Sequence, residues 1–509
     1  MPNPALGVSG LAPLVNPVRL ESRYLTRHGI IAGSTGTGKS RAMQLLAEQL
    51  ADGGVNVFVS DVKGDASGFC VQGKDSERNE KAQFRPHAIK TNYWSASPEL
   101  ARLRFSLREI GPVLLSRLLE LNSTQESHLS LAFSFSRKNK TALDTIEDLL
   151  AVLDEMVENE ERGISKSSVS VIERKLLSLQ ESGLDRMFGS PSVSLDDLRG
   201  LNVLNLSDSR KKMLVSIAPA FLLQKLFDEL PEVGEVAEPE YAIFFDEAHY
   251  LFKDANKSLR DLIVTILKQI RSKGVSVFFV TQDVADLPDD ILSQLGTKII
   301  FAQRIATAKG EADLRALAKS FPKTGEFDLM EDLKALPPGV AMVTTLDGEG
   351  NQTKPVKVSL FAPATTMEVV DYATLRKETD PGLLAKYSAA TPLPKPKAPS
   401  AKPETQNAKR APQPAPQAKP KTQGAKPAAT GPPIWDAVFP FLLKLLDFAL
   451  KALGKVANAI VVKPLQGFFK WIFRKPVRMV YVLLFLLLLY VLYVNWALVQ
   501  GFLDRLKFG

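Results

Sequence analysis

Short apolar runs alternate along residues 1–380 with longer stretches in which apolar residues recur every three or four positions. Runs with apolar residues at consecutive positions are typical of strands buried on both faces, and their alternation with helices is the pattern of a mostly parallel sheet covered on both sides. We therefore predict one α/β domain over residues 1–380. Its strands are expected at residues 29–32, 55–60, 202–206, 241–245, 275–280, 298–301 and 340–345.

Residues from about 98 to 200 follow a different pattern. Apolar residues keep a helical period there, for example around Leu114–Leu121 and Leu143–Met156, and no convincing strand interrupts them. This range is predicted to be a helical insertion in the α/β domain.

The segment Gly33–Ser40 reads GSTGTGKS and directly follows the first apolar run, which predicts a phosphate-binding loop between a strand and a helix. Its glycines let the backbone curl so that successive amides point at phosphate oxygens, and the next helix directs its positive end there. Lys39 is expected to bridge the β- and γ-phosphates of ATP, and Ser40 to hold Mg²⁺. The nucleotide-binding residues predicted from this loop are Gly33, Ser34, Thr35, Gly36, Thr37, Gly38, Lys39 and Ser40.

Two adjacent carboxylates, Asp246 and Glu247, end the apolar run that begins at Tyr241. Asp246 can accept a magnesium-bound water, and Glu247 can orient or deprotonate the attacking water. Because side chains alternate along a strand, we expect the two carboxylates to point in opposite directions. The alternative is that both acids simply begin a helix, where they suit the helix dipole. Together with the phosphate-binding loop, the pair favours ATP hydrolysis over passive nucleotide binding.

Other polar residues follow predicted strands and are expected at the same sheet edge, where ligands bind in such folds. Asp61, Lys63 and Asp65 come directly after one run and are predicted to form a wall of the site. Gln282 follows the run 275–280 and can sense the γ-phosphate or the attacking water, or else cap the next helix. Arg271 lies just before that run and is either an arginine finger for a neighbouring subunit or an ordinary solvated residue at a helix end.

These residues together resemble the HerA/FtsK superfamily of ring-forming P-loop ATPases, in particular its bacterial HerA-like C-terminal-domain family. The similarity covers roughly residues 18–360. It is carried by Arg27-His28-Gly29 with the phosphate-binding loop, and by residues 61–65, 111–125, 245–249, 270–274, 281–282 and 294–296.

The resemblance implies a RecA-like core, a homohexamer that moves double-stranded DNA, and a possible separate nuclease partner. It assigns nucleotide chemistry to Lys39, Ser40, Asp246, Glu247 and Gln282, with Arg271 matching the trans-acting arginine. Arg27 matches an arginine that acts in cis near the phosphates. Two features depart from the family pattern. About 28 residues precede the strand of the loop, too few for the small N-terminal barrel of archaeal HerA, and a membrane tail is added.

Charge is distributed unevenly along the chain, whose net charge is +8. Residues 1–390 hold 46 Lys and Arg against 52 Asp and Glu, whereas residues 391–509 hold 18 against 4. The body is therefore mildly acidic, and any DNA contact is expected from a local patch or a ring lumen. The single Cys70 excludes an internal disulfide framework, and the four histidines show no spacing for a zinc site.

The C-terminal region is predicted to attach the protein to a membrane. Residues 381–433 are assigned to a disordered linker, because residues 391–433 hold 12 prolines and no aromatic residue. Residues 477–503 are predicted to form a transmembrane helix, since 479–503 contain no charge and 25 residues exceed the length of a bilayer core. Lys and Arg are more frequent before this span than after it, which predicts a single-pass bacterial inner-membrane protein with a cytoplasmic ATPase body.

Residues 434–473 form an amphipathic region between the linker and the span. Lys444, Asp447, Lys451 and Lys455 recur at helical spacing as one polar stripe on an otherwise apolar wheel. This pattern predicts a helix that lies in the membrane interface or mediates oligomerisation.

Three classes of function remain open on the sequence. The leading hypothesis is a membrane-anchored ATPase that translocates DNA. The second is an ATPase that powers protein secretion or envelope assembly through an envelope partner, which suits the acidic body and basic tail. The third is a nucleotide-dependent scaffold, against which Glu247 and Arg271 argue, because a scaffold needs neither a water-orienting acid nor an arginine finger.

Overall fold

We analysed a computed structural model of the chain. It describes residues 3–9, 17–81, 84–95, 99–161, 163–207, 212–253, 256–304, 307–325 and 328–388. The predicted linker beyond residue 388, the amphipathic region 434–473 and the span 477–503 lie outside these residues. Among the described helices, none combines the length and apolar character that crossing a membrane requires.

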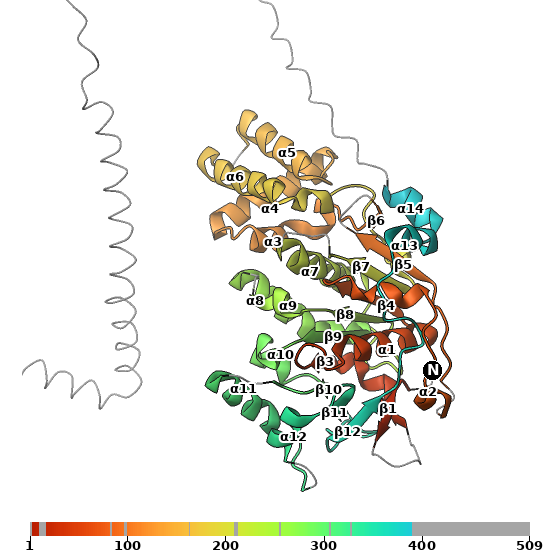
Figure 1. Ribbon diagram of the computed structural model, residues 1–509. Helices are drawn as coiled ribbons and strands as arrows, with labels where there is room; N and C mark the ends of the chain where they lie inside the picture. The colour runs from red at the N-terminus through yellow and green to blue at the C-terminus, as the bar shows by residue number, and fades with distance from the viewer. Residues whose placement is uncertain are drawn as a thin grey trace, which may run out of the picture. The chain divides into compact units, whose positions relative to one another are not determined.

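The described part of the chain forms one twelve-stranded sheet (Figure 1). Eight neighbouring strands run parallel, and the remaining four continue the sheet in antiparallel fashion. In spatial order the strands are β2 (Pro17–Arg19), β1 (Ala5–Ser9), β12 (Val356–Leu360), β11 (Val340–Thr344), β10 (Thr297–Ile300), β3 (Gly29–Ala32), β9 (Val275–Thr281), β8 (Tyr241–Phe245), β4 (Asn56–Asp61), β7 (Leu201–Asn205), β5 (Thr91–Ser95) and β6 (Ala101–Arg102).

The prediction of a mostly parallel α/β sheet is confirmed, with one difference at its margin. The run 340–345 was grouped with the parallel strands, but β11 pairs antiparallel with β10. The chain returns beside β10, and β12 and β1 then extend the sheet away from the phosphate-binding loop.

The central strands are buried on both faces, which explains their uninterrupted apolar sequences. Successive side chains of β8 point to opposite sides, so that Ile243 and Phe245 join one core while Ala242 and Phe244 join the other. Phe244 stacks on Phe278 of β9, with ring centroids 5.0 Å apart. The sheet is thus covered by helices on both sides.

Helix α1 (Lys39–Asp52) contributes Ala42, Met43, Leu46 and Leu50 to one of these cores. The other core contains α7 (Lys212–Glu229) and α9 (Lys257–Gln269), together with the predicted helical insertion. The remaining described helices are α2 (Glu77–Lys81), α8 (His249–Lys253), α10 (Asp289–Leu292), α11 (Ala308–Lys319), α12 (Leu329–Ala335), α13 (Tyr372–Glu378) and α14 (Pro381–Ser388).

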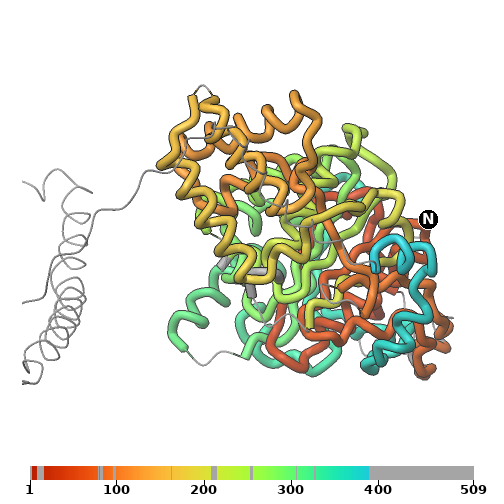
Figure 2. The backbone as a smooth tube through the Cα atoms, turned by 90° about the horizontal axis from the view of Figure 1, so that it is seen from above, coloured from red at the N-terminus to blue at the C-terminus, as the bar shows by residue number. Residues whose placement is uncertain are grey.

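The helical insertion begins later than its sequence pattern indicated. Strand β6 lies within the range 98–200 and pairs with β5, so the first residues of that range complete the sheet edge. The helices that follow form a group at one side of the body (Figure 2). They are α3 (Leu107–Leu118), α4 (Ser123–Asn139), α5 (Ile146–Glu158) and α6 (Lys166–Ser182).

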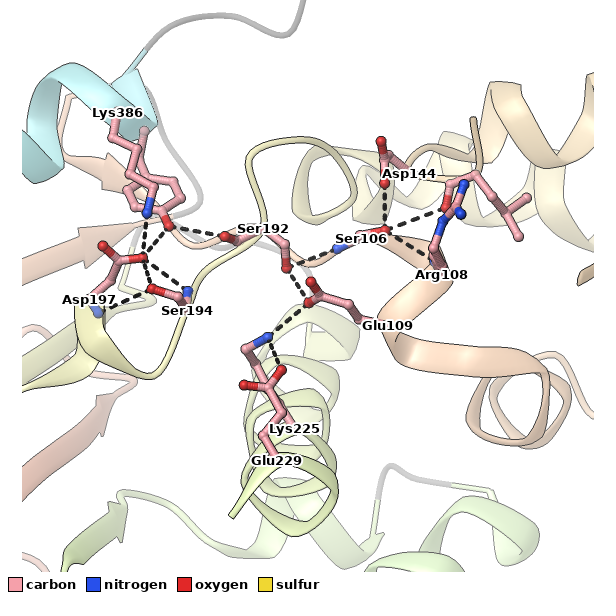
Figure 3. Close-up of polar contacts among 12 residues, drawn as sticks. Ser106, Arg108, Glu109, Asp144, Ser192, Ser194, Asp197, Lys225, Glu229 and Lys386 are labelled. Atoms are coloured by element: carbon pink, nitrogen blue, oxygen red, sulfur yellow. Dashed lines mark hydrogen bonds and ion pairs between the residues drawn. The ribbon is translucent and has the colours of Figure 1, made fainter. Parts of the chain in front are cut away.

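The folded body extends past residue 380, so the prediction that the linker begins at 381 is wrong. Tyr387 of α14 is fully buried and meets Trp94 edge-on, with ring centroids 5.2 Å apart. Its hydroxyl donates to Asp197 at 2.6 Å, and Lys386 pairs with the same carboxylate at 2.7 Å (Figure 3). The proline-rich composition that indicates a linker starts only after these contacts.

We predict that Tyr387→Ala lowers the free energy of unfolding by about 3 kcal/mol, because it leaves a cavity beside Trp94. Lys386→Ala removes a partly exposed ion pair and is expected to change stability by less than about 1 kcal/mol. Urea denaturation of the purified protein, followed by tryptophan fluorescence, measures both. Equally small effects would contradict the assignment of α14 to the folded body.

Candidate nucleotide-binding and hydrolysis site

The loop between β3 and α1 has the backbone that its glycines predicted. Gly36 and Gly38 have φ of 77° and 128°, a region that favours glycine. A Cβ on Gly38 would lie 2.8 Å from the ring of Phe301, so space also excludes a side chain there. Gly38 offers no side-chain cap to α1, and the first amides of this helix are therefore available to an anion.

Lys39 and Ser40 begin α1 at the carboxyl edge of the sheet. The Lys39 ammonium is buried and donates to the carbonyl oxygens of Gly33 at 2.6 Å and Ser34 at 3.2 Å. Burial, together with the nearby Lys63 charge, lowers the pKa of Lys39. Both effects make this position favourable for an anionic ligand such as a phosphate.

Three carboxylates meet beside Ser40, with one oxygen of each within 4.8 Å of the others: Asp61, Asp65 and Asp246. Ser40 Oγ donates to Asp65 Oδ2 at 3.1 Å. Burial raises the pKa of Asp246 to about 7, although the Lys63 charge opposes the shift. Asp65 Oδ1 and Asp246 Oδ2 are buried without a hydrogen-bond partner among the described residues. These oxygens and the Ser40 hydroxyl fit Mg²⁺, which prefers hard oxygen ligands.

Asp61 has a different role from the other two acids. Its carboxylate accepts the backbone amides of Lys63, Gly64 and Ala66 at 3.2, 2.8 and 3.0 Å. The pKa of Asp61 is raised to about 6, because burial outweighs these bonds. Asp61 thus fixes the turn that brings Lys63 and Asp65 to the site. These are the three residues that the sequence predicts as a wall of the site.

Glu247 lies at the centre of a hydrogen-bonded line that starts in the phosphate-binding loop. Thr35 Oγ1 donates to Gln282 Oε1 at 3.2 Å, and Gln282 Nε2 donates to Glu247 Oε1 at 3.0 Å. The Lys63 ammonium lies 2.5 Å from the same Glu247 oxygen. Burial works against ionisation of Glu247, but the bonds from Lys63 and Gln282 prevail and lower its pKa. Glu247 is therefore an ionised base within reach of the loop.

The expectation that Asp246 and Glu247 point in opposite directions is wrong. Lys63 Nζ lies 3.8 Å from Asp246 and 2.5 Å from Glu247, so one ammonium serves both carboxylates. The strand ends at Phe245, and Glu247 has φ of 49°, so the chain turns before strand alternation can apply. The turn places the Glu247 carboxylate beside Gln282, which contacts Thr35 of the phosphate-binding loop.

Two contacts of Glu247 were not anticipated from the sequence. Lys63 was expected only as part of a wall, yet it is the counterion of Asp246 and Glu247. His249 Nδ1 lies 3.1 Å from Glu247 Oε2. In the sequence, Lys63 and His249 are marked only by their position within a few residues of a strand end. That position does not specify the partners of either side chain.

Arg271 and Arg27 lie at the opposite edge of the sheet. Arg271 is on the short helix η5 (Ile270–Lys273) before β9, and Arg27 ends η1 (Ser22–Arg27) before β3. Together with Arg23 they line a cavity of about 350 Å³. The cis role expected of Arg27 is therefore wrong, because the four residues of β3, about 13 Å long, separate it from its own phosphate-binding loop.

A second cavity adjoins the loop on the β10 side. It has a volume of about 440 Å³ and is lined by Ser34, Thr35, Gln282 and Arg304, among others. Ser34 Oγ accepts a hydrogen bond from the backbone amide of Arg304 at 2.7 Å, which joins the loop to the segment that follows β10. This cavity provides room beside the phosphate position for the rest of a nucleotide.

Comparison with known proteins gives a consistent result. The family model for the helicase HerA-like C-terminal domain matches residues 12–426. The DNA double-strand break repair helicase HerA of Sulfurisphaera tokodaii is 25% identical over 338 residues, covering 64% of each chain. The protein of the same name from Sulfolobus acidocaldarius is 24% identical over 290 residues, covering 56% of each chain. The chain thus spans less than two thirds of the length of these relatives.

The fold is also found among solved structures. The plasmid coupling protein TrwB, in complex with a non-hydrolysable GTP analogue, superposes with a TM-score of 0.50 at 15% sequence identity. The match covers 72% of this chain and 93% of the TrwB chain. At this identity the similarity concerns the fold alone.

We predict that Lys39→Ala abolishes ATP binding, because it removes the ammonium at the phosphate position. Glu247→Gln keeps the shape of the site but not the base, so it should bind ATP while turnover falls by roughly 10²- to 10⁴-fold. Binding of a fluorescent ATP analogue and release of phosphate measure the two effects. Lys74→Ala, at an exposed lysine paired with Glu368, is the control and should change neither. Normal turnover by Glu247→Gln would remove Glu247 from the catalytic machinery.

Proposed function

Because the chain belongs to the helicase HerA-like C-terminal family, we propose that it is an ATP-hydrolysing ring motor. In this proposal the motor translocates double-stranded DNA and is held at the bacterial inner membrane by its C-terminal segment. The observation that carries hydrolysis is the line from Thr35 through Gln282 to the ionised Glu247.

The proposed reaction places each described group in one role. The amides of the loop and Lys39 bind the β- and γ-phosphates. Ser40, Asp65 and Asp246 would hold a Mg²⁺ ion, whose charge would offset that of the phosphates. Glu247 orients a water for attack on the γ-phosphorus and accepts its proton. Gln282 reports the state of the γ-phosphate to the loop through Thr35. Lys63 keeps Glu247 ionised within a cluster of acids.

A homohexameric ring is supported by the position of the arginines. Arg271 lies at the sheet edge away from its own site and is exposed, so its guanidinium can act only in another copy of the chain. In that copy it stabilises the charge that develops on the transferred phosphoryl group, as an arginine finger does. The ring therefore completes each active site from two subunits.

Double-stranded DNA is the proposed cargo because the relatives are named as DNA repair helicases. The body carries a small excess of acids, so contact with DNA requires a local basic surface. Arg137, Lys138 and Lys140, exposed at the end of α4, provide one candidate.

The competing proposal is an ATPase that moves protein or drives envelope assembly at the same membrane. The acidic charge of the body and the basic charge of residues 391–509 favour this competing proposal, because neither feature needs a nucleic-acid partner to explain it. A separate nuclease partner belongs only to the DNA proposal, and an envelope partner to this one.

We predict that linear double-stranded DNA stimulates ATP hydrolysis by residues 1–390 several-fold, and that the stimulation weakens as salt is raised because phosphate contacts release counterions. Phosphate release is measured with and without DNA at two salt concentrations, with Glu247→Gln as the blank. A rate that DNA does not change would favour protein cargo or envelope assembly.

The membrane proposal predicts that the full-length protein sediments with bacterial membranes and resists extraction at high salt and alkaline pH. A version that ends at residue 433 lacks both the amphipathic region and the predicted span, and it is expected in the soluble fraction. A version that lacks only residues 391–433 keeps the span and should remain in the membrane. Release of the full-length protein by salt alone would contradict a transmembrane anchor.

A further inference from the structure

One buried histidine joins the segments that carry the two arginines at the amino edge of the sheet. His28 lies between η1 and β3, and only 5% of its surface is exposed. Its Nδ1 accepts the amide of Val277 at 3.1 Å, and its Nε2 lies 2.9 Å from the carbonyl oxygen of Leu267. Because an amide can only donate, Nδ1 is the acceptor and the proton is on Nε2, which donates to Leu267. The imidazole is therefore neutral and bonded at both nitrogens.

The two partners of His28 flank the segment that bears Arg271. Leu267 is in the last turn of α9 and Val277 is near the start of β9, with η5 between them. Ser276 Oγ adds a second link by donating to the carbonyl of Leu25 on η1 at 2.6 Å. Contacts from His28 and η1 thus hold the two elements on either side of the segment that carries Arg271. These contacts set the direction in which the Arg271 side chain points from the surface.

The backbone of His28 fixes Arg27 in the same way. His28 has φ of 57°, a region that L-residues rarely adopt and that persists only where the surroundings hold it. The amide of Gly296 donates to the carbonyl of Arg27 at 2.9 Å, and the amide of Thr297 donates to that of His28 at 3.2 Å. Both arginines consequently face the same cavity from braced positions.

The surroundings also keep the imidazole uncharged. Burial lowers the pKa of His28 to about 4, and the charge of Arg271 contributes to the shift. The neutral imidazole holds the segments that carry Arg27 and Arg271 without adding a further positive charge beside the arginines.

We propose that His28 is a positioning residue for ATP hydrolysis, one that directs Arg271 into the phosphate site of a neighbouring copy of the chain. The proposal rests on the ring and on the trans role of Arg271 proposed above. A guanidinium stabilises developing charge only when it is aimed at it, so loss of the brace lowers kcat more than it changes the KM for ATP.

The first measurement is the steady-state kinetics of full-length His28→Leu, in which an apolar side chain of similar size replaces the imidazole and makes neither bond. We expect kcat to fall roughly 10- to 100-fold, part of the effect of an arginine finger, while the KM for ATP changes less than about threefold. His28→Asn retains an acceptor for Val277 and tolerates the positive φ, so it should retain more activity. A normal kcat for His28→Leu would overturn the proposal.

The second measurement separates an effect on the neighbour from damage to the subunit itself. His28→Leu is co-assembled with Glu247→Gln, whose own site is inactive but whose Arg271 is intact. We expect turnover per His28→Leu subunit to rise about fivefold or more, because some of its sites now receive a correctly directed arginine. If turnover does not rise, His28 acts on its own subunit and the proposal is wrong.

Arg271→Ala co-assembled with Glu247→Gln is the matched control. Recovery in this control without recovery of His28→Leu would refute only the role of His28. Failure of the control would refute the trans arginine, and with it both the ring mechanism and the role of His28. If His28→Leu does not fold, the same co-assembly with His28→Asn decides the question.

Discussion

The polarity of the parallel strands is the constraint on which the rest of the structure depends. β3 pairs with β9, and β8 with β4, so that Ala32 lies opposite Thr281 and Ser60 opposite Phe245. The residues just beyond these positions, among them Gly33, Gln282 and Asp246, therefore meet at one edge. Neighbouring strands are about 4.8 Å apart, so four strand ends fit within the length of a nucleoside triphosphate. The amino ends of these parallel strands lie at the other edge.

This constraint concentrates charge at the carboxyl edge. Four carboxylates, Asp61, Asp65, Asp246 and Glu247, lie there with the ammonium groups of Lys39 and Lys63. Burial works to lower the pKa of Lys63, but the charges of Asp246 and Glu247 prevail and raise it. Lys63 therefore stays positively charged. Buried charges of one sign are unfavourable unless they are paired, and Asp246 shows this in its raised pKa. The same arrangement suits a ligand that brings a divalent cation and phosphate groups together.

The amino edge has the opposite character. Arg23, Arg27 and Arg271 line one cavity there, and Glu235, 93% exposed, pairs with Arg27 at 3.7 Å. A single chain thus separates its phosphate-binding loop from its arginines by the length of the strands. In the proposed ring, assembly of copies would bring the two edges together, and His28 would brace the arginine side of that interface. The Tyr387 contacts show where the folded body leads into the tail that is proposed to hold the ring at the membrane.

The sequence by itself determined the α/β class, the phosphate-binding loop and the polar residues at the strand ends, because these depend on local pattern: buried runs, glycine spacing and the residues that follow each run. It did not determine the antiparallel margin, the helix at 381–388, or the shared direction of Asp246 and Glu247. Each of these depends on which distant segments pair, or on a turn after a strand end. Tertiary packing alone brought Lys63 to Glu247 and His28 between Leu267 and Val277, since no local rule relates residues so far apart in the chain.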